Sequence, residues 1–271
     1  MANQTNTTAS GEKKSNLAPF VIIGLIFVAT IAGIYYITQT GDRSTGNTAT
    51  NTAGNSNSGS QTAQPLANYA TAPPGASPAH YKGSEGAPVI VEEFADFQCP
   101  TCAVVHPRMN EVVSRFGTKI KFVFRNYPLT TIHRNAYDAS VAAEAAGFQN
   151  KFWEMQNLLF QNQSRWSTAP QPRPLFEEYA TTLGLDVEKF KNDMAGFAAK
   201  GRVDEDMRRA RALNLTGTPS ILVNGKPVNG YETAIIAQAV ETELARFEQS
   251  SESAAPAGED KPAEAPANQN Q

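Results

Sequence analysis

Residues 89–107 have the sequence VIVEEFADFQCPTCAVVHP. Residues 89–94 form a short, largely apolar run that predicts a central β-strand. The helix that follows is predicted to begin at Pro100, which suits a first turn because no backbone N–H is needed there, and to run to about Phe116. Cys99 is therefore expected to lie where a strand ends and a helix begins.

Cys99 and Cys102 are the only cysteines among 271 residues, too few for a disulfide scaffold or a four-thiolate zinc site. Unpaired N–H groups and the positive end of the helix dipole gather at a helix N-terminus, where they lower a thiol pKa from ~8.5 to roughly 3.5–7.5. Cys102 lies about one turn further on and is expected to be more buried. The spacing predicts a redox pair in which Cys99 attacks and Cys102 resolves. Two packed thiols, or a metal site completed by His106 and His133, are the alternatives.

The rest of the central region alternates between strands and helices. Residues 120–125 alternate with period two and predict the next strand, whereas residues 135–213 are mainly helical in pattern. Asn224 and Gly225 predict the tight turn of a hairpin, and residues 231–247 predict a final amphipathic helix. This order predicts an α/β fold with an inserted helical block.

Residues 17–38 are apolar and carry no charged side chain. About 20 residues at ~1.5 Å each span roughly 30 Å, the thickness of the hydrocarbon core of a bilayer. We expect an uncleaved signal-anchor that crosses the membrane, with a cleaved signal peptide or a buried core helix as alternatives. Lys13 and Lys14 precede the span, so the positive-inside rule predicts a cytoplasmic N-terminus and an extracytoplasmic remainder.

The composition then divides the chain into five predicted parts. These are a cytoplasmic tail at 1–16, a transmembrane helix at 17–38, a flexible linker at 39–80, a folded domain at 81–249 with its helical insertion at about 133–213, and a disordered tail at 250–271. A net charge of -3 and a pI near 5.7 give no reason to expect a nucleic-acid partner.

Three stretches carry a family resemblance. VIVEEFADFQCPTCAVVHP resembles the active-site strand and helix of DsbA-like thiol:disulfide oxidoreductases, a branch of the thioredoxin fold. LTGTPSILVNGKPVNGY at 215–231 is similar to the family's cis-proline loop and closing hairpin, and residues 133–163 are similar to its helical insertion. The resemblance implies a thioredoxin-like α/β fold with an inserted helical subdomain, here preceded by one transmembrane helix, and a redox centre that needs no cofactor and no metal.

The resemblance also implies a substrate-binding surface around the cysteines. Pro219 matches the family's cis-proline, beside which Thr218 would offer its backbone to an extended substrate. Pro100 and Thr101, which separate the two cysteines, are expected to contact substrate as well.

Glu93 lies six residues before Cys99, where related proteins place a buried carboxylate behind the resolving cysteine. Such a carboxylate has a raised pKa and could exchange a proton with Cys102, so we expect Glu93 to be catalytic. Strand alternation would turn Glu92 to the opposite face. The alternative is a pair of solvated acids at the end of a strand.

Three further side chains are expected to have ordinary structural roles. His106 is expected to pack beside the site, Asp96 to be a polar residue at a strand end, and Trp153 to belong to the core of the insertion.

By resemblance, the chain would form disulfide bonds in exported proteins that carry free thiols or disulfides, and a membrane redox partner would regenerate it. The dipeptide between the cysteines is Pro-Thr, whereas the strong oxidant of the family has Pro-His. A histidine could support the thiolate by its charge, but Thr101 can only form hydrogen bonds, so the oxidising strength is open. A membrane-tethered reductase or isomerase therefore stays open, as does a non-catalytic thioredoxin-like binding or chaperone module.

Overall fold

The computed structural model describes residues 64–254. The predicted cytoplasmic tail (1–16) and transmembrane helix (17–38) lie outside the described residues, as does most of the predicted C-terminal tail. Among the described residues, no helix combines the length and apolarity needed to cross a membrane.

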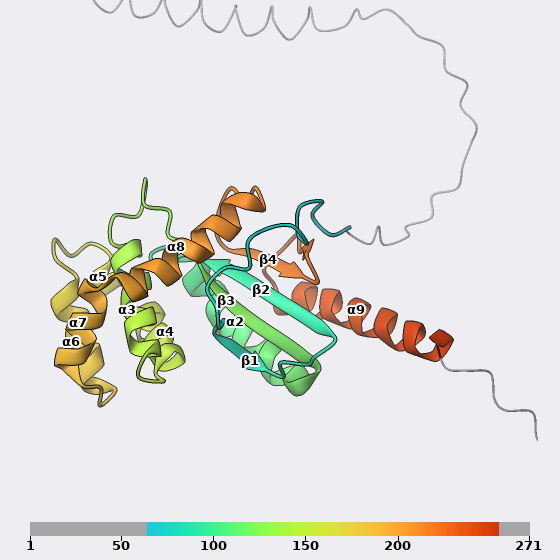
Figure 1. The fold of residues 1–271 in the computed structure, drawn as a ribbon, viewed down its shortest axis with the longest axis horizontal. Helices are drawn as coiled ribbons and strands as arrows, with labels where there is room; N and C mark the ends of the chain where they lie inside the picture. Colours follow the sequence, from blue (N-terminus) through green and yellow to red (C-terminus); the bar gives the residue numbers. More distant parts are fainter. Residues whose placement is uncertain (1–63, 255–271) are drawn as a thin grey trace, which may run out of the picture. The chain divides into compact units, whose positions relative to one another are not determined.

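A five-stranded mixed sheet lies at the centre of the described region, in the order β1-β3-β2-β4-β5 (Figure 1). The two central strands are parallel and the other pairs antiparallel. The strands are β1 (Tyr81–Gly83), β2 (Val89–Ala95), β3 (Ile120–Asn126), β4 (Ser220–Val223) and β5 (Lys226–Pro227). The sequence pattern did not predict β1, because three residues at a sheet edge are too few to show a period of two.

Helices cover both faces of this sheet. Helix α2 (Pro100–Phe116) is followed by a 3₁₀ turn (Gly117–Lys119), and α2 packs against the C-terminal helix α9 (Thr233–Ala254). Helix α8 (Phe197–Ala212) packs against β3. The predicted strand–helix junction is therefore confirmed, with β2 ending four residues before Cys99 and α2 beginning directly after it.

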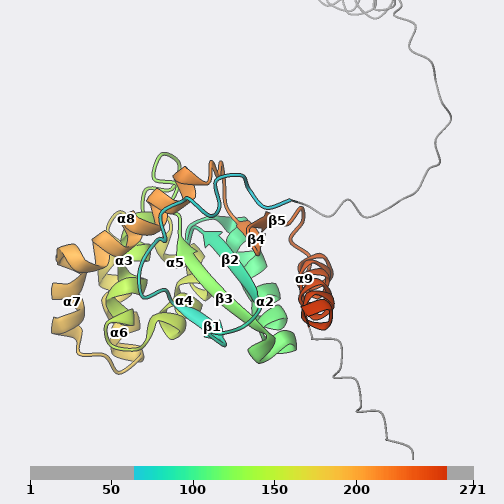
Figure 2. The same cartoon turned by 45° about the vertical axis from the view of Figure 1, so that its right-hand side comes forward.

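The predicted helical block is also confirmed. Before α8 it contains α3 (Ala136–Gly147), α4 (Phe152–Gln161), α5 (Gln163–Trp166), α6 (Arg173–Thr182) and α7 (Val187–Ala195). Large side chains fill its interior, among them the fully buried Trp166, Phe176 and Phe190. Figure 2 shows these helices at one end of the sheet and α9 at the other.

The predicted hairpin turn forms between β4 and β5. Asn224 and Gly225 both have positive φ, 47° and 77°, which is the left-handed backbone that a tight two-residue hairpin turn requires. The predicted end of the last helix at residue 247 is wrong, because α9 continues to Ala254 and so includes the first residues assigned to a disordered tail.

Residues 64–80, which we call the strap, were predicted to be flexible linker but pack along the domain. The Leu66 N–H donates to the Gly225 carbonyl at 2.9 Å, and the Tyr69 hydroxyl donates to Glu92 at 2.8 Å. The composition of the strap does not predict this packing. The strap is poor in charge and rich in Ala and Pro, and the side chains that hold it come from elsewhere in the chain. The folded region therefore begins before residue 81.

Buried charges on the α8 side of the sheet hold the strap. Glu92 on β2 accepts hydrogen bonds from Arg125 Nε at 3.1 Å and from Arg209 Nε and Nη2 at 3.0 and 2.7 Å. The same arginines donate to the carbonyls of Ala76 and Pro73 at 3.1 and 2.9 Å. Burial by itself would raise the pKa of Glu92, but the Arg209 hydrogen bonds and the charge of Arg125 hold it below its usual value.

We predict that Tyr69→Phe lowers the free energy of unfolding by about 1.5–3 kcal/mol, the usual contribution of a hydrogen bond to a charged group. Urea denaturation would measure the loss, which comes from removing one donor to the buried Glu92 carboxylate. Tyr81→Phe is the matched control, because Tyr81 lies on edge strand β1 and is exposed. Equal stability of Tyr69→Phe and the control would show that the strap contributes nothing through this bond.

Candidate functional site

Cys99 is the residue that precedes the first turn of α2, with φ -70° and ψ 122°. Its N–H donates to the Asp96 carbonyl at 3.1 Å, and its carbonyl accepts the first helical hydrogen bond, from Ala103 N at 3.2 Å. The Cys99 thiol donates to the Thr218 carbonyl at 3.4 Å and is 7% exposed. Both cysteines are free thiols, so this arrangement is that of the reduced pair.

The surroundings of Cys99 stabilise its thiolate. The Cys102 thiol donates a hydrogen bond to the Cys99 sulfur and, with the backbone N–H groups of Cys102 and Thr101, lowers the pKa of Cys99 to about 5, although burial opposes this. The N–H groups at the start of α2 thus contribute to the lowered pKa of Cys99, after the larger effect of the Cys102 side chain.

Cys102 has the opposite character. Its side chain is fully buried in α2, and burial, followed by the hydrogen bond with Cys99, raises the pKa of Cys102 far above its usual value. The two sulfurs are therefore chemically distinct near neutral pH, since Cys99 ionises while Cys102 keeps its proton.

The loop before β4 completes the surroundings of Cys99. The Thr218-Pro219 peptide bond is cis, as the resemblance implied. The Thr218 side chain also helps to lower the pKa of Cys99. Pro100 and Thr101 are both exposed at the start of α2, next to Cys99, whereas Pro219 itself is buried.

Glu92 and Glu93 are adjacent on β2 and both are 2% exposed, so the alternative of solvated strand-end acids is wrong. Strand alternation places them on opposite faces: Glu92 meets the arginines on the α8 side and Glu93 lies on the α2 side. Burial raises the pKa of Glu93 to about 8, which the charge of Lys82 only partly offsets. Burial and the hydrogen bond with Cys99 are the main reasons for the raised pKa of Cys102, and a negative charge on Glu93 would raise that pKa further. Glu93 is thus a protonated carboxyl near neutral pH, close to the buried thiol.

Lys82 is a residue of the site that sequence reasoning missed. It comes from β1, donates to Asn110 Oδ1 on α2 at 3.2 Å, and lies 4.5 Å above the ring of Trp153. Burial lowers the pKa of Lys82, while the charges of Glu154 and Glu93 oppose this. Because β1 itself was not predicted, nothing in the local pattern pointed to Lys82.

His106 packs as expected, against the ring of Phe160 at 4.8 Å, with Nε2 2.7 Å from Asn157 Oδ1. Among residues 64–254 there is no group of three or more His, Cys, Asp or Glu side chains that could hold a metal ion. Residues 64–254 therefore contain no ligand set for the alternative metal site.

Asp96 has a larger role than a polar strand end. Its fully buried carboxylate accepts from Gln98 N at 2.7 Å, from Leu129 N at 2.8 Å, and lies 2.7 Å from His133 Nδ1. It thereby joins the turn before Cys99 to the loop after β3 and to His133.

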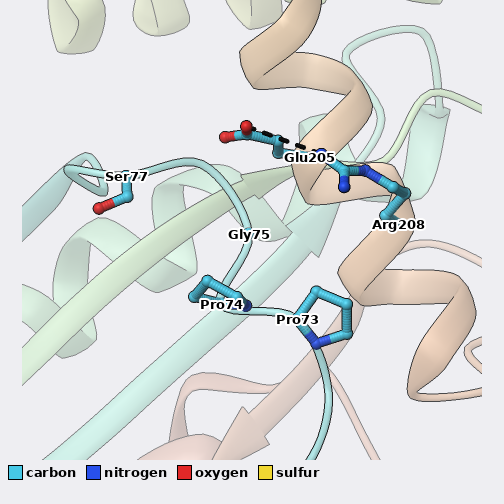
Figure 3. Close-up of a pocket in the computed structure, with 6 residues that line it drawn as sticks. All are labelled: Pro73, Pro74, Gly75, Ser77, Glu205 and Arg208. Carbon is cyan, nitrogen blue, oxygen red and sulfur yellow. Dashed lines mark ion pairs between the residues drawn. The ribbon is translucent and has the colours of Figure 1, made fainter.

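A pocket of about 190 Å³ lies elsewhere, between the strap and α8 (Figure 3). Figure 3 shows Glu205 and Arg208 of α8 opposite the Pro73–Ser77 part of the strap, with an ion pair of 3.6 Å between them. No residue that lines it belongs to the cysteine site, so we assign it no part in the chemistry.

Comparison with known proteins identifies the fold. Residues 76–241 match a family model described as thioredoxin. The chain is similar to a thioredoxin-like oxidoreductase from Silicibacter pomeroyi DSS-3, with 26% identity, a TM-score of 0.53, and coverage of 62% of this chain and 92% of that one. BdbD from Bacillus subtilis (24% identity, TM-score 0.56, 62% and 93% coverage) and alpha-DsbA1 from Wolbachia pipientis (16%, 0.58, 64% and 94%) share the fold. The predicted thioredoxin-like fold with a helical insertion is confirmed.

Similar curated proteins are much longer than this chain. The protein named Na(+)/H(+) antiporter NhaA 1 from Mycolicibacterium gilvum is 36% identical over 167 residues, which are 60% of this chain and 26% of that protein. The protein of the same name from Salinispora arenicola is 38% identical over 61% of this chain and 25% of its own length. The chain thus spans about a quarter of the length of the curated relatives it matches.

We predict that Glu93→Gln changes how stability depends on pH. A carboxyl whose pKa is about 8 in the folded chain keeps a proton that the unfolded chain loses above about 4.5. The free energy of unfolding of the wild type should therefore fall between about pH 4.5 and 8 and then level off. That of Glu93→Gln should not show this decrease.

Urea denaturation of the reduced protein at several pH values would measure the effect. Above pH 8, Glu93→Gln should exceed the wild type by up to a few kcal/mol, since one pKa unit corresponds to ~1.4 kcal/mol. Glu92→Gln is the matched control and should instead lose about 3–5 kcal/mol at pH 7, because it leaves buried arginines without their partner. Parallel pH curves for Glu93→Gln and the wild type would contradict the prediction.

Proposed function

This chain belongs to the thioredoxin family, and we propose that it is a DsbA-like thiol–disulfide oxidoreductase that forms disulfide bonds in exported proteins through Cys99 and Cys102. The observation that carries the proposal is the difference between the two sulfurs. Cys99 has a pKa lowered to about 5, while that of Cys102 is raised by burial. This difference gives the pair one good leaving group and one sulfur that holds its proton.

In the proposed reaction, a substrate thiolate attacks the Cys99 sulfur of the oxidised pair, and the bond between Cys99 and Cys102 breaks. Cys102 leaves with the electron pair and takes a proton, for which the protonated Glu93 carboxyl is the candidate donor. A second substrate thiolate then attacks the substrate sulfur of the mixed disulfide and releases Cys99 as a thiolate. The substrate has lost two electrons, and the cysteine pair has gained them.

Substrate binding is proposed for the surface around Cys99. The Thr218 carbonyl lies 3.4 Å from the Cys99 sulfur, so a peptide lying along this loop would be held with its own sulfur beside Cys99. Pro100 and Thr101 are exposed directly after Cys99 at the start of α2 and would contact the same peptide.

The direction proposed is oxidation. A pKa of about 5 for Cys99 lies between the values typical of thioredoxin, ~7, and of the strong oxidant DsbA, ~3.5. Stabilising the thiolate stabilises the reduced pair and so makes the disulfide more oxidising. A reductase would be favoured by a Cys99 pKa near 7, and the intact cysteine pair argues against a purely binding or chaperone module.

The location proposed is the outer side of a membrane. The apolar residues 17–38 after Lys13 and Lys14 support it, as do relatives named Na(+)/H(+) antiporter, of whose length this chain matches about a quarter. The partners would be exported proteins with free thiols and a membrane redox protein that reoxidises the pair.

We predict that Cys102→Ser accumulates mixed disulfides with exported proteins, because Cys99 can still be joined to a substrate but no resolving thiol remains. Non-reducing electrophoresis of cells that express the variant, followed by identification of the trapped proteins, would measure this. Cys99→Ser is the matched control and should trap almost none. Preferential trapping by Cys99→Ser would reverse the assigned roles, and trapping of cytoplasmic proteins alone would contradict the location.

A further inference from the structure

The turn that carries Cys99 is held by a side chain from the helical insertion. Gln163, the first residue of α5, donates from Nε2 to the Phe97 carbonyl at 2.7 Å and to the Cys99 carbonyl at 2.9 Å. The orientation of this amide is not ambiguous, because both partners are acceptors and only the NH₂ group can donate. One amide therefore fixes two carbonyls that lie two residues apart.

Other amides fix the position of α5 relative to this turn. Gln98, between the two carbonyls, accepts from Asn135 N at 2.9 Å and donates to Ser167 O at 3.0 Å. The Asn135 side chain donates to the carbonyls of Trp166, Ser167 and Ala169 at 2.9–3.1 Å. Gln163 thus approaches Cys99 from a segment that is itself anchored.

The Cys99 carbonyl and sulfur belong to the same residue at the start of α2. The backbone N–H groups of Thr101 and Cys102 point to the sulfur only if the turn that precedes them keeps its geometry. Apart from the N–H of Ala103, one turn further along α2, Gln163 is the donor found on the Cys99 carbonyl among the described residues.

We propose that Gln163 is a positioning residue that holds the Cys99 backbone in the conformation in which its sulfur ionises and reacts. The helical insertion then contributes a residue to the redox centre. The effect of Gln163 on catalysis rests on the proposed function. Its effect on the ionisation of Cys99 does not.

Gln163→Met keeps the length of the side chain and removes both hydrogen bonds. The full-length reduced protein would be alkylated with iodoacetamide over a range of pH, and the midpoint of the rate profile gives the ionisation of Cys99, since Cys102 is buried and protonated. We expect the midpoint to rise by about 0.5–1 pH unit. The equilibrium constant for exchange with glutathione should change by about three- to tenfold toward a less oxidising pair, up to ~30 mV.

Two controls separate positioning from stability. Gln161→Met makes the same chemical change at an exposed residue two positions away and should leave the profile unchanged. Tyr69→Phe should lower stability from the strap, on the α8 side of the sheet, without moving the midpoint. The proposal is overturned if Gln163→Met keeps the wild-type midpoint, or if Tyr69→Phe moves it by as much. Failure of Cys102→Ser to trap any substrate would refute the proposed function instead, and would leave these midpoints interpretable.

Discussion

The position of one sulfur atom at the start of α2 is the constraint on which the rest of the structure depends. Hydrogen bonds from the Cys102 thiol and from two backbone N–H groups stabilise the Cys99 thiolate, and they can do so only if strand, turn and helix meet in a fixed geometry. The buried strand β2 brings the chain to this point, and the Thr218 carbonyl approaches from the loop before β4. The low pKa of Cys99 comes from these surrounding groups, because an isolated cysteine has a pKa of ~8.5.

The same strand shows how burial and pairing set opposite charge states in adjacent residues. Glu92 is buried among arginines, stays ionised and ties the strap to α8. Glu93 is buried, no cation of residues 64–254 donates a hydrogen bond to it, and burial raises its pKa to about 8. A period of two in the strand is sufficient to assign one glutamate to the architecture and the other to the neighbourhood of Cys102. The insertion contributes in a third way, by holding the backbone of the Cys99 turn through Gln163.

Much of this could be predicted from local sequence. The strand, Pro100 and the cysteine spacing indicated the helix N-terminus, and Asn224 with Gly225 indicated the hairpin. The strap and Gln163 could not be predicted, because each acts by hydrogen bonds between a side chain and a distant backbone group. Such bonds leave no hydrophobic period and no motif. Lys82 was missed for a related reason, since its strand is too short to show a pattern.

The central claim is that the difference between the two cysteines makes their disulfide an oxidant. The reduction potential of the full-length protein, measured by equilibration in glutathione buffers, tests this most directly. Between the strongest known oxidant at about -120 mV and an isomerase at about -180 mV, 60 mV corresponds to roughly a hundredfold in equilibrium constant. We expect a potential within that interval. A value near about -270 mV, that of thioredoxin, would contradict it and make this chain a reductase.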